Sequence, residues 1–149
     1  MNLFTKISVL VLIPIMVFAA QDPSNVPALR ARLAQCDKLS DGSNMSLCVA
    51  NVGANTDTEL NRVYAALTAQ YAELAKGETH DGSDYNTQLL SRLRIAERAW
   101  LTYRDAQCNA DVGGAIGGIG YTGESYVSGK CIANQTLDRI SYLETQPGQ

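Results

Sequence analysis

The sequence LLSRLRIAERAWLTYRDAQC, residues 89–108, contains the only tryptophan of the chain, four arginines and one of its four cysteines. Its larger apolar residues recur at steps of 4, 3, 4 and 3, which places them on one stripe of an α-helix. They are Leu89, Leu93, Ala96, Trp100 and Tyr103. An amphipathic helix is only marginally stable alone in water, so this stripe predicts helical partners elsewhere in the chain.

A second helix with the same apolar period is predicted over residues 57–76, before the first helix, which we expect to span residues 85–110. Thr56 and Glu59 match a capping box, with Thr56 as the N-cap residue. The connection between the two helices, GETHDGSD, is short and polar. The sequence therefore predicts an antiparallel helical hairpin whose apolar stripes face each other.

Shorter N- and C-terminal helices complete an all-α fold. We expect one helix over residues 27–39, with Pro27 in its first turn, and a short helical piece over residues 45–52 that ends at residues 53–55. Seven glycines fall between residues 113 and 129, which predicts a glycine-rich loop of about fifteen residues. The last helix should begin at Glu124 or Ser128 and end at Leu143.

The first 20 residues have the pattern of a secretory signal peptide, with Lys6, an apolar run to Phe18 and small residues at Ala19 and Ala20. The run is shorter than the roughly 20 apolar residues of a spanning helix, so we expect no membrane anchor after cleavage. Residues 21–149 should form one domain. Without Lys6 the chain has 11 basic and 15 acidic residues, a formal charge near −4, which disfavours nucleic acid as a partner.

The four cysteines of an exported chain predict two disulfides rather than a metal site. Their spacings of 12, 60 and 23 residues contain no close pair of zinc ligands, and the single histidine, His80, lies in a polar segment. Three pairings are open. We favour Cys36–Cys48 and Cys108–Cys131, because each closes a local segment that contains a turn.

No motif of the sequence predicts an enzyme or a cofactor site. Residues 118–123 match GxGxxG, but a predicted helix, rather than the strand of a dinucleotide-binding unit, precedes them. His80 has no neighbouring nucleophile with a local signature, and Asp57 and Glu59 are explained by the helix N-terminus near which they lie. We therefore expect no catalytic residues, no metal and no cofactor.

Two strings of residues carry a family resemblance, together with the glycine-rich gap, Cys131 and a final segment around Arg139. They are D-x-x-L-N-x-x-Y at Asp57, Leu60, Asn61 and Tyr64, and W-x-x-Y-R-D-x-x-C at Trp100, Tyr103, Arg104, Asp105 and Cys108. Over about residues 36–143 the chain resembles the LprI-type lysozyme inhibitor domain. The resemblance implies an all-helical, disulfide-bonded, periplasmic or secreted domain without enzymatic activity.

The resemblance also implies a protein partner, lysozyme or another muramidase, although inhibition is known for only part of that family. The alternative is a structural or stress-related periplasmic interaction module without inhibitor activity. An enzyme that acts on cell-wall material ranks third, because no acid, base and nucleophile set is evident.

We expect the glycine-rich loop to supply the binding site, because glycines permit unusual backbone shapes and polar and aromatic side chains follow them. The candidate contacts are Tyr121, Glu124, Ser125 and Tyr126. The motif residues are expected to form an internal scaffold, with Asn61 and Arg104 in a partly buried polar network and Trp100 under the hairpin. The alternative is a functional surface that includes Arg98 or Arg104.

Overall fold

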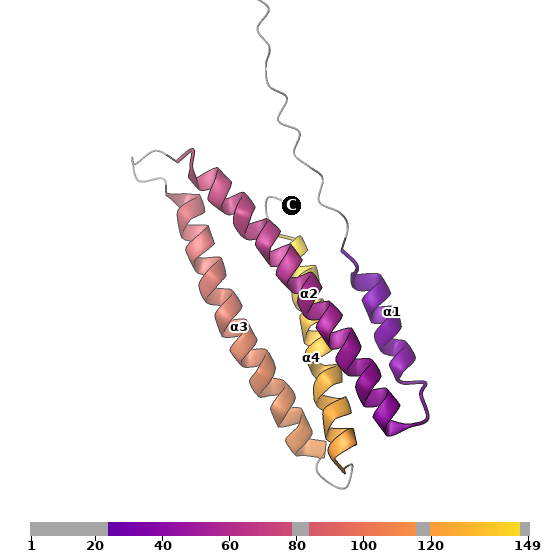
Figure 1. Cartoon of the computed structure of the whole chain (residues 1–149). Helices are drawn as coiled ribbons and strands as arrows, with labels where there is room; N and C mark the ends of the chain where they lie inside the picture. The colour runs from indigo at the N-terminus through magenta and orange to yellow at the C-terminus, as the bar shows by residue number, and fades with distance from the viewer. Residues whose placement is uncertain (1–23, 79–83, 116–119, 147–149) are drawn as a thin grey trace, which may run out of the picture.

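The computed structural model of the chain describes residues 24–78, 84–115 and 120–146, and these form four α-helices and no strand. The helices are α1 (Val26–Cys36), α2 (Gly42–Ala75), α3 (Tyr85–Ala115) and α4 (Gly120–Glu144). Figure 1 shows α2 and α4 running in the same direction, with α3 antiparallel to both and α1 beside α2. The all-α fold and its α2–α3 hairpin are confirmed. None of the described helices is both long enough and apolar enough to cross a membrane.

Helix α2 is continuous, whereas the sequence predicted a break at residues 53–55 and a new start at Thr56. Asp41 is the N-cap and accepts a hydrogen bond from the Asn44 amide at 2.9 Å. Thr56 lies inside the helix, and its hydroxyl donates to the Gly53 carbonyl at 2.8 Å. One glycine within a helix costs about 1 kcal/mol. Burial of Val49 and Val52, each worth roughly 1.5–3 kcal/mol, outweighs that cost.

The hydrophobic core lies between α1, α2 and α4. Each helix contributes one buried stripe, namely Val26, Leu29, Leu33 and Cys36 from α1, Val49, Val52, Leu60, Val63, Leu67 and Tyr71 from α2, and Ala133, Leu137, Ile140 and Leu143 from α4. Helix α2 packs most extensively against α4. The centre of the fold is therefore the α2–α4 pair, rather than the tryptophan-containing helix α3.

Helix α3 packs on this core with a face that is only partly apolar. Leu89, Leu93 and Trp100 of the predicted stripe are partly buried against the core, whereas Ala96 of the same stripe is exposed. Tyr103, at the end of that stripe, is 56% exposed, and the neighbouring Arg104 is 9% exposed. The inward face thus turns away from the predicted stripe, and it carries the ion pairs of Arg104 with Asp57 and of Glu97 with Arg139.

The glycine-rich segment is mostly helical, and this corrects the predicted loop. Helix α3 extends to Ala115 and α4 begins at Gly120, before the predicted start at residue 124 or 128. Gly129 lies within α4, where an added Cβ would come 2.9 Å from Cγ1 of Val49. This glycine therefore allows α4 to approach α2 closely, and the packing gained there offsets its poor helix propensity.

Two disulfides join successive helices at one end of the bundle. Cys36 pairs with Cys48, which ties α1 to α2, and Cys108 pairs with Cys131, which ties α3 to α4. This is the predicted pairing. Neither disulfide joins α2 to α3, so noncovalent contacts and the connection after Ala75 hold these two helices together.

Candidate functional site

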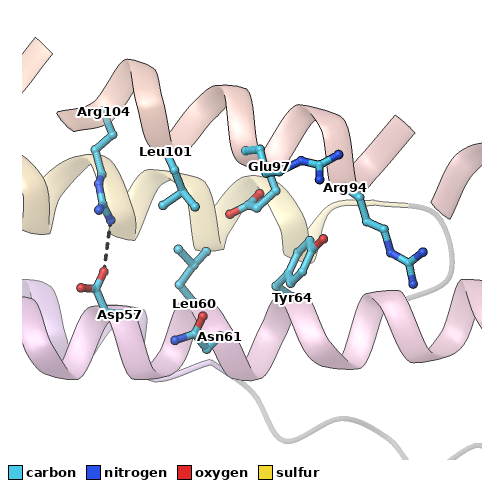
Figure 2. A pocket seen from close by; sticks show the side chains of 9 residues that line it. Asp57, Leu60, Asn61, Tyr64, Arg94, Glu97, Leu101 and Arg104 are labelled. Atoms are coloured by element: carbon cyan, nitrogen blue, oxygen red, sulfur yellow. Dashed lines mark hydrogen bonds and ion pairs between the residues drawn. The ribbon is translucent and has the colours of Figure 1, made fainter. Parts of the chain in front are cut away.

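A groove of about 370 Å³ lies between α2 and α3, and Figure 2 shows it from close by. Its lining consists of Asp57, Leu60, Asn61 and Tyr64 from α2 and of Arg94, Glu97, Arg98, Leu101 and Arg104 from α3. The residues from α2 follow the spacing i, i+3, i+4 and i+7, which places them on one face of the helix. They are the four named positions of the first string that carries the family resemblance.

Arg104 closes one end of the groove and is held on three sides. Its Nη1 donates to Oδ1 of Asp57 at 3.1 Å and to Oγ1 of Thr136 at 3.2 Å, and its Nε donates to Oδ1 of Asp105 at 2.9 Å. The dashed line in Figure 2 marks its contact with Asp57. Arg104 thus connects α2, α3 and α4. Asn61 was expected in this network, but it lies exposed on the groove wall instead.

A second ion pair lies behind the groove. Arg139 of α4 donates two hydrogen bonds to Oε2 of Glu97, at 2.9 and 2.8 Å, and both side chains are largely buried. The Arg139 guanidinium also lies 5.5 Å from the Trp100 ring centroid and 5.0 Å from that of Tyr142. The other carboxylate oxygen of Glu97 is buried and accepts no hydrogen bond from the described residues.

Arg94 and Arg98 lie exposed along the α3 side of the groove. Neither guanidinium forms an ion pair or hydrogen bond with another described residue, in contrast to those of Arg104 and Arg139. Like charges four residues apart on a helix repel each other, at a cost of about 0.2–0.5 kcal/mol. The groove therefore carries two uncompensated positive charges beside its apolar residues, Leu60 and Leu101.

The residues predicted as a binding site lie elsewhere, at the start of α4. The Tyr126 hydroxyl donates to Oδ1 of Asp37 at 2.5 Å, and Lys130 donates to Oδ2 of the same carboxylate at 2.6 Å. The hydrogen bond from Lys130, and then that from Tyr126, lowers the pKa of Asp37, and the same contact with Asp37 raises the pKa of Lys130. Tyr126 thus helps to fasten α4 to the end of α1.

Glu124 is half-buried and Ser125 is exposed in the first turns of α4. The side chain of Tyr121 lies outside the described residues, as do the signal segment, His80 and the first part of the GxGxxG string. Of the four predicted contact residues, the structure describes the side chains of Glu124, Ser125 and Tyr126, which lie at consecutive positions of α4.

Sequence reasoning missed most of the α3 side of the groove. Charged residues of an amphipathic helix are ordinarily exposed to solvent, whereas Glu97 is only 6% exposed and is paired with Arg139. The spacing of the four α2 residues was a usable signal, because it places them on one helix face. No signal in the sequence indicated that Arg94 and Glu97 would face them.

Among residues 24–78, 84–115 and 120–146, no group of three His, Cys, Asp or Glu side chains is placed to hold a metal ion. The charged groups of the groove are suited to binding a charged or hydrogen-bonding partner group.

Comparison with known proteins adds a family to this geometry. A family model described as "Lysozyme inhibitor LprI" matches residues 36–143, a span that contains both disulfides and the whole groove. A protein of Rhizobium meliloti (strain 1021) described as uncharacterized is 29% identical over 109 residues, which cover 73% of this chain and 76% of the relative. No solved structure matches the chain significantly.

Proposed function

Because the chain belongs to the LprI lysozyme inhibitor family, we propose that it is an exported binding protein that inhibits lysozyme or a related peptidoglycan hydrolase. Inhibition occurs by direct protein–protein contact, and the protein itself turns over no substrate. The observation that carries this proposal is the family match over residues 36–143. In this proposal residues 1–20 direct export, and residues 21–149 form one inhibitor domain in the periplasm or outside the cell.

The charge of the chain supports a muramidase as the partner. The formal net charge is −3, and many lysozymes are basic proteins with an acidic catalytic cleft. Opposite net charges accelerate the encounter of two proteins, and the local charges of the contact surface then determine the orientation. The net negative charge of the chain would accelerate its encounter with a basic muramidase, and the exposed Arg94 and Arg98 would then orient it toward the acidic cleft.

Two surfaces are candidates for the contact. One is the start of α4, with Tyr121, Glu124, Ser125 and Tyr126, as the sequence predicted. The other is the groove between α2 and α3. The hydroxyl of Tyr126 already bonds Asp37, so partner contacts at the start of α4 would rely mainly on Glu124 and Ser125.

The test is a titration of peptidoglycan lysis by a panel of muramidases with the oxidised protein lacking residues 1–20. We expect stoichiometric inhibition of at least one muramidase. Glu124→Ala/Ser125→Ala tests the start of α4, and Glu73→Ala/Ser91→Ala, which removes the same two groups from exposed positions on α2 and α3, is the matched control. Lysis unchanged for every muramidase would refute the proposal and favour an envelope interaction module.

A further inference from the structure

We propose that Arg94 and Arg98 hold the two catalytic carboxylates of the muramidase, with the groove between α2 and α3 as the docking surface. This inference rests on the proposed function and identifies the surface and the chemistry of the contact. It would make α3, rather than the start of α4, the element that blocks the catalytic cleft.

The distribution of charge around the groove is the first argument. Two less exposed arginines are already engaged, Arg104 with Asp57 and Asp105, and Arg139 with Glu97. Arg94 and Arg98 are exposed, and neither has an acidic partner in the described part of the chain. Two adjacent guanidiniums without counter-charges attract anionic groups, and a planar guanidinium binds a carboxylate through two parallel hydrogen bonds.

The spacing of the two arginines is the second argument. Residues four apart on a helix have Cβ atoms about 5–6 Å apart. Most glycosidases use a pair of carboxylates that lie about 5–5.5 Å apart in retaining enzymes and about 6.5–9.5 Å apart in inverting enzymes. One turn of α3 can therefore place one guanidinium opposite each catalytic carboxylate.

The remaining lining of the groove suits a protein surface. Leu60 and Leu101 give it apolar area, and the exposed amide of Asn61 forms no hydrogen bond with another described residue. In Figure 2 the Glu97 carboxylate is directed into the groove, and its Oε1 is the buried oxygen without a partner.

The rigid support of Arg94 and Arg98 is the third argument. They lie on either side of Glu97, whose ion pair with Arg139 fixes this turn of α3 against α4. A preorganised helix turn loses little conformational entropy on binding, whereas a mobile loop would first have to be ordered.

The test compares two double variants that remove the same charge. Arg94→Gln/Arg98→Gln removes the groove pair, and Lys38→Gln/Arg92→Gln removes two exposed cations that do not line the groove. Affinity is measured by calorimetry with a muramidase that the wild-type protein inhibits, and circular dichroism verifies that both variants fold. Since truncation of one desolvated charge pair weakens binding substantially, we expect the groove variant to bind at least about 30-fold more weakly. The control should stay within about 2-fold of wild type.

A double-mutant cycle assigns the contact to the catalytic carboxylates. The muramidase with its catalytic acid changed from Glu to Gln should bind the wild-type inhibitor more weakly, and this change should have little further effect on the Arg94→Gln/Arg98→Gln variant. An oligomer of N-acetylglucosamine that fills the cleft should compete with the inhibitor.

Three results would overturn the inference while leaving the proposed function intact. They are equal affinities of the groove variant and wild type, an equal loss in the control variant, and additive effects in the cycle. Binding of the wild-type protein to isolated peptidoglycan, lost in the groove variant, would overturn it in favour of a glycan site. If the wild-type protein inhibits no muramidase, the proposed function fails, and this inference fails with it.

Discussion

Replacing Glu97 by alanine should destabilise the protein more than any surface substitution, although Glu97 is a charged residue of an outer helix. The side chains of Glu97 and Arg139 are only 8% and 12% exposed, and two hydrogen bonds of 2.9 and 2.8 Å join them. Removal of one partner of a buried ion pair costs about 3–5 kcal/mol, because the other charge stays desolvated and unpaired. A small domain has only about 5–15 kcal/mol of stability in total.

The surroundings of Arg139 set the expected size of the loss within this range. In Glu97→Ala, Arg139 keeps its contacts with the rings of Trp100 and Tyr142, each worth about 0.5–2 kcal/mol. The loss should therefore be near 3 kcal/mol. Arg139→Ala loses these ring contacts and also leaves Glu97 without its cation, so its loss should be near 5 kcal/mol.

Urea unfolding of the oxidised protein, followed by circular dichroism, measures these losses. With an m-value of about 1–3 kcal/mol/M, a loss of 3 kcal/mol lowers the midpoint by roughly 1–3 M. Glu97→Leu/Arg139→Met should recover most of the stability, because two apolar residues of similar volume need no desolvated charge. A loss below about 1 kcal/mol in Glu97→Ala, or a double variant less stable than both single variants, would show that this ion pair is not effectively buried.

Three further predictions concern the disulfides, two glycines and the Asp37 cluster. Replacing Cys108 and Cys131 by serine should lower the free energy of unfolding by about 3.4 kcal/mol, and replacing Cys36 and Cys48 should lower it by about 2.8 kcal/mol, because the closed loops span 23 and 12 residues. A larger fall of the melting temperature on loss of Cys36–Cys48 than on loss of Cys108–Cys131 would contradict this. Gly53→Ala should stabilise the protein by about 0.5–1 kcal/mol, because the added Cβ meets nothing within 4 Å. Gly129→Ala should destabilise it by about 1–3 kcal/mol, because the added Cβ would meet Val49. Urea midpoints of the two variants that move in the same direction would refute the packing argument. Asp37 has a folded-state pKa below its ordinary 3.8, so its stabilisation is present above that pH and is lost as the pH falls through the folded value. Lys130 has a folded-state pKa above its ordinary 10.5, so its stabilisation is present below that pH and is lost as the pH rises through the folded value. Asp37→Asn should therefore reduce the fall of the urea midpoint both at acidic and at alkaline pH. A pH profile identical to that of the wild type would exclude a role for this cluster.

Much of the helical framework could be predicted from the sequence because apolar period and cysteine spacing are local signals. The stripe through Leu60, Leu67 and Tyr71 is buried as its period indicates. Pro27 lies in the first turn of α1, as expected for a residue with a fixed φ and no amide hydrogen. The disulfide pairing followed from the same local reasoning, since each bond joins two consecutive helices.

The errors arose where tertiary packing outweighs local preference. The apolar period places Tyr103 inside, whereas it is 56% exposed, and the inward position is taken by Arg104, which two aspartates and a threonine hold in the expected partly buried polar network. The glycines in residues 113–129 are poor helix formers, but close packing on Val49 makes Gly129 acceptable within α4. Neither effect is visible before the register of one helix against another is known.

The candidate site was predictable on its α2 side, and on its α3 side only for Arg98 and Arg104. The four residues of the D-x-x-L-N-x-x-Y string share a helix face by their spacing alone, and all four line the groove. Their neighbours on α3 depend on how far α3 is rotated about its axis, and the Glu97–Arg139 pair sets that rotation. An ion pair between residues 42 positions apart leaves no local signature.

The positions of the two disulfides determine which helices are joined by a covalent bond. They divide it into two covalently tied pairs, α1 with α2 and α3 with α4, and the groove lies on the boundary between the pairs. Widening the groove therefore breaks no covalent bond, whereas separating α1 from α2 or α3 from α4 at the stapled end would. Amide hydrogen exchange should accordingly be slowest beside the four cysteines and should increase along α3 toward Tyr85. A partner that binds in the groove would slow exchange on the α2 and α3 residues that line it.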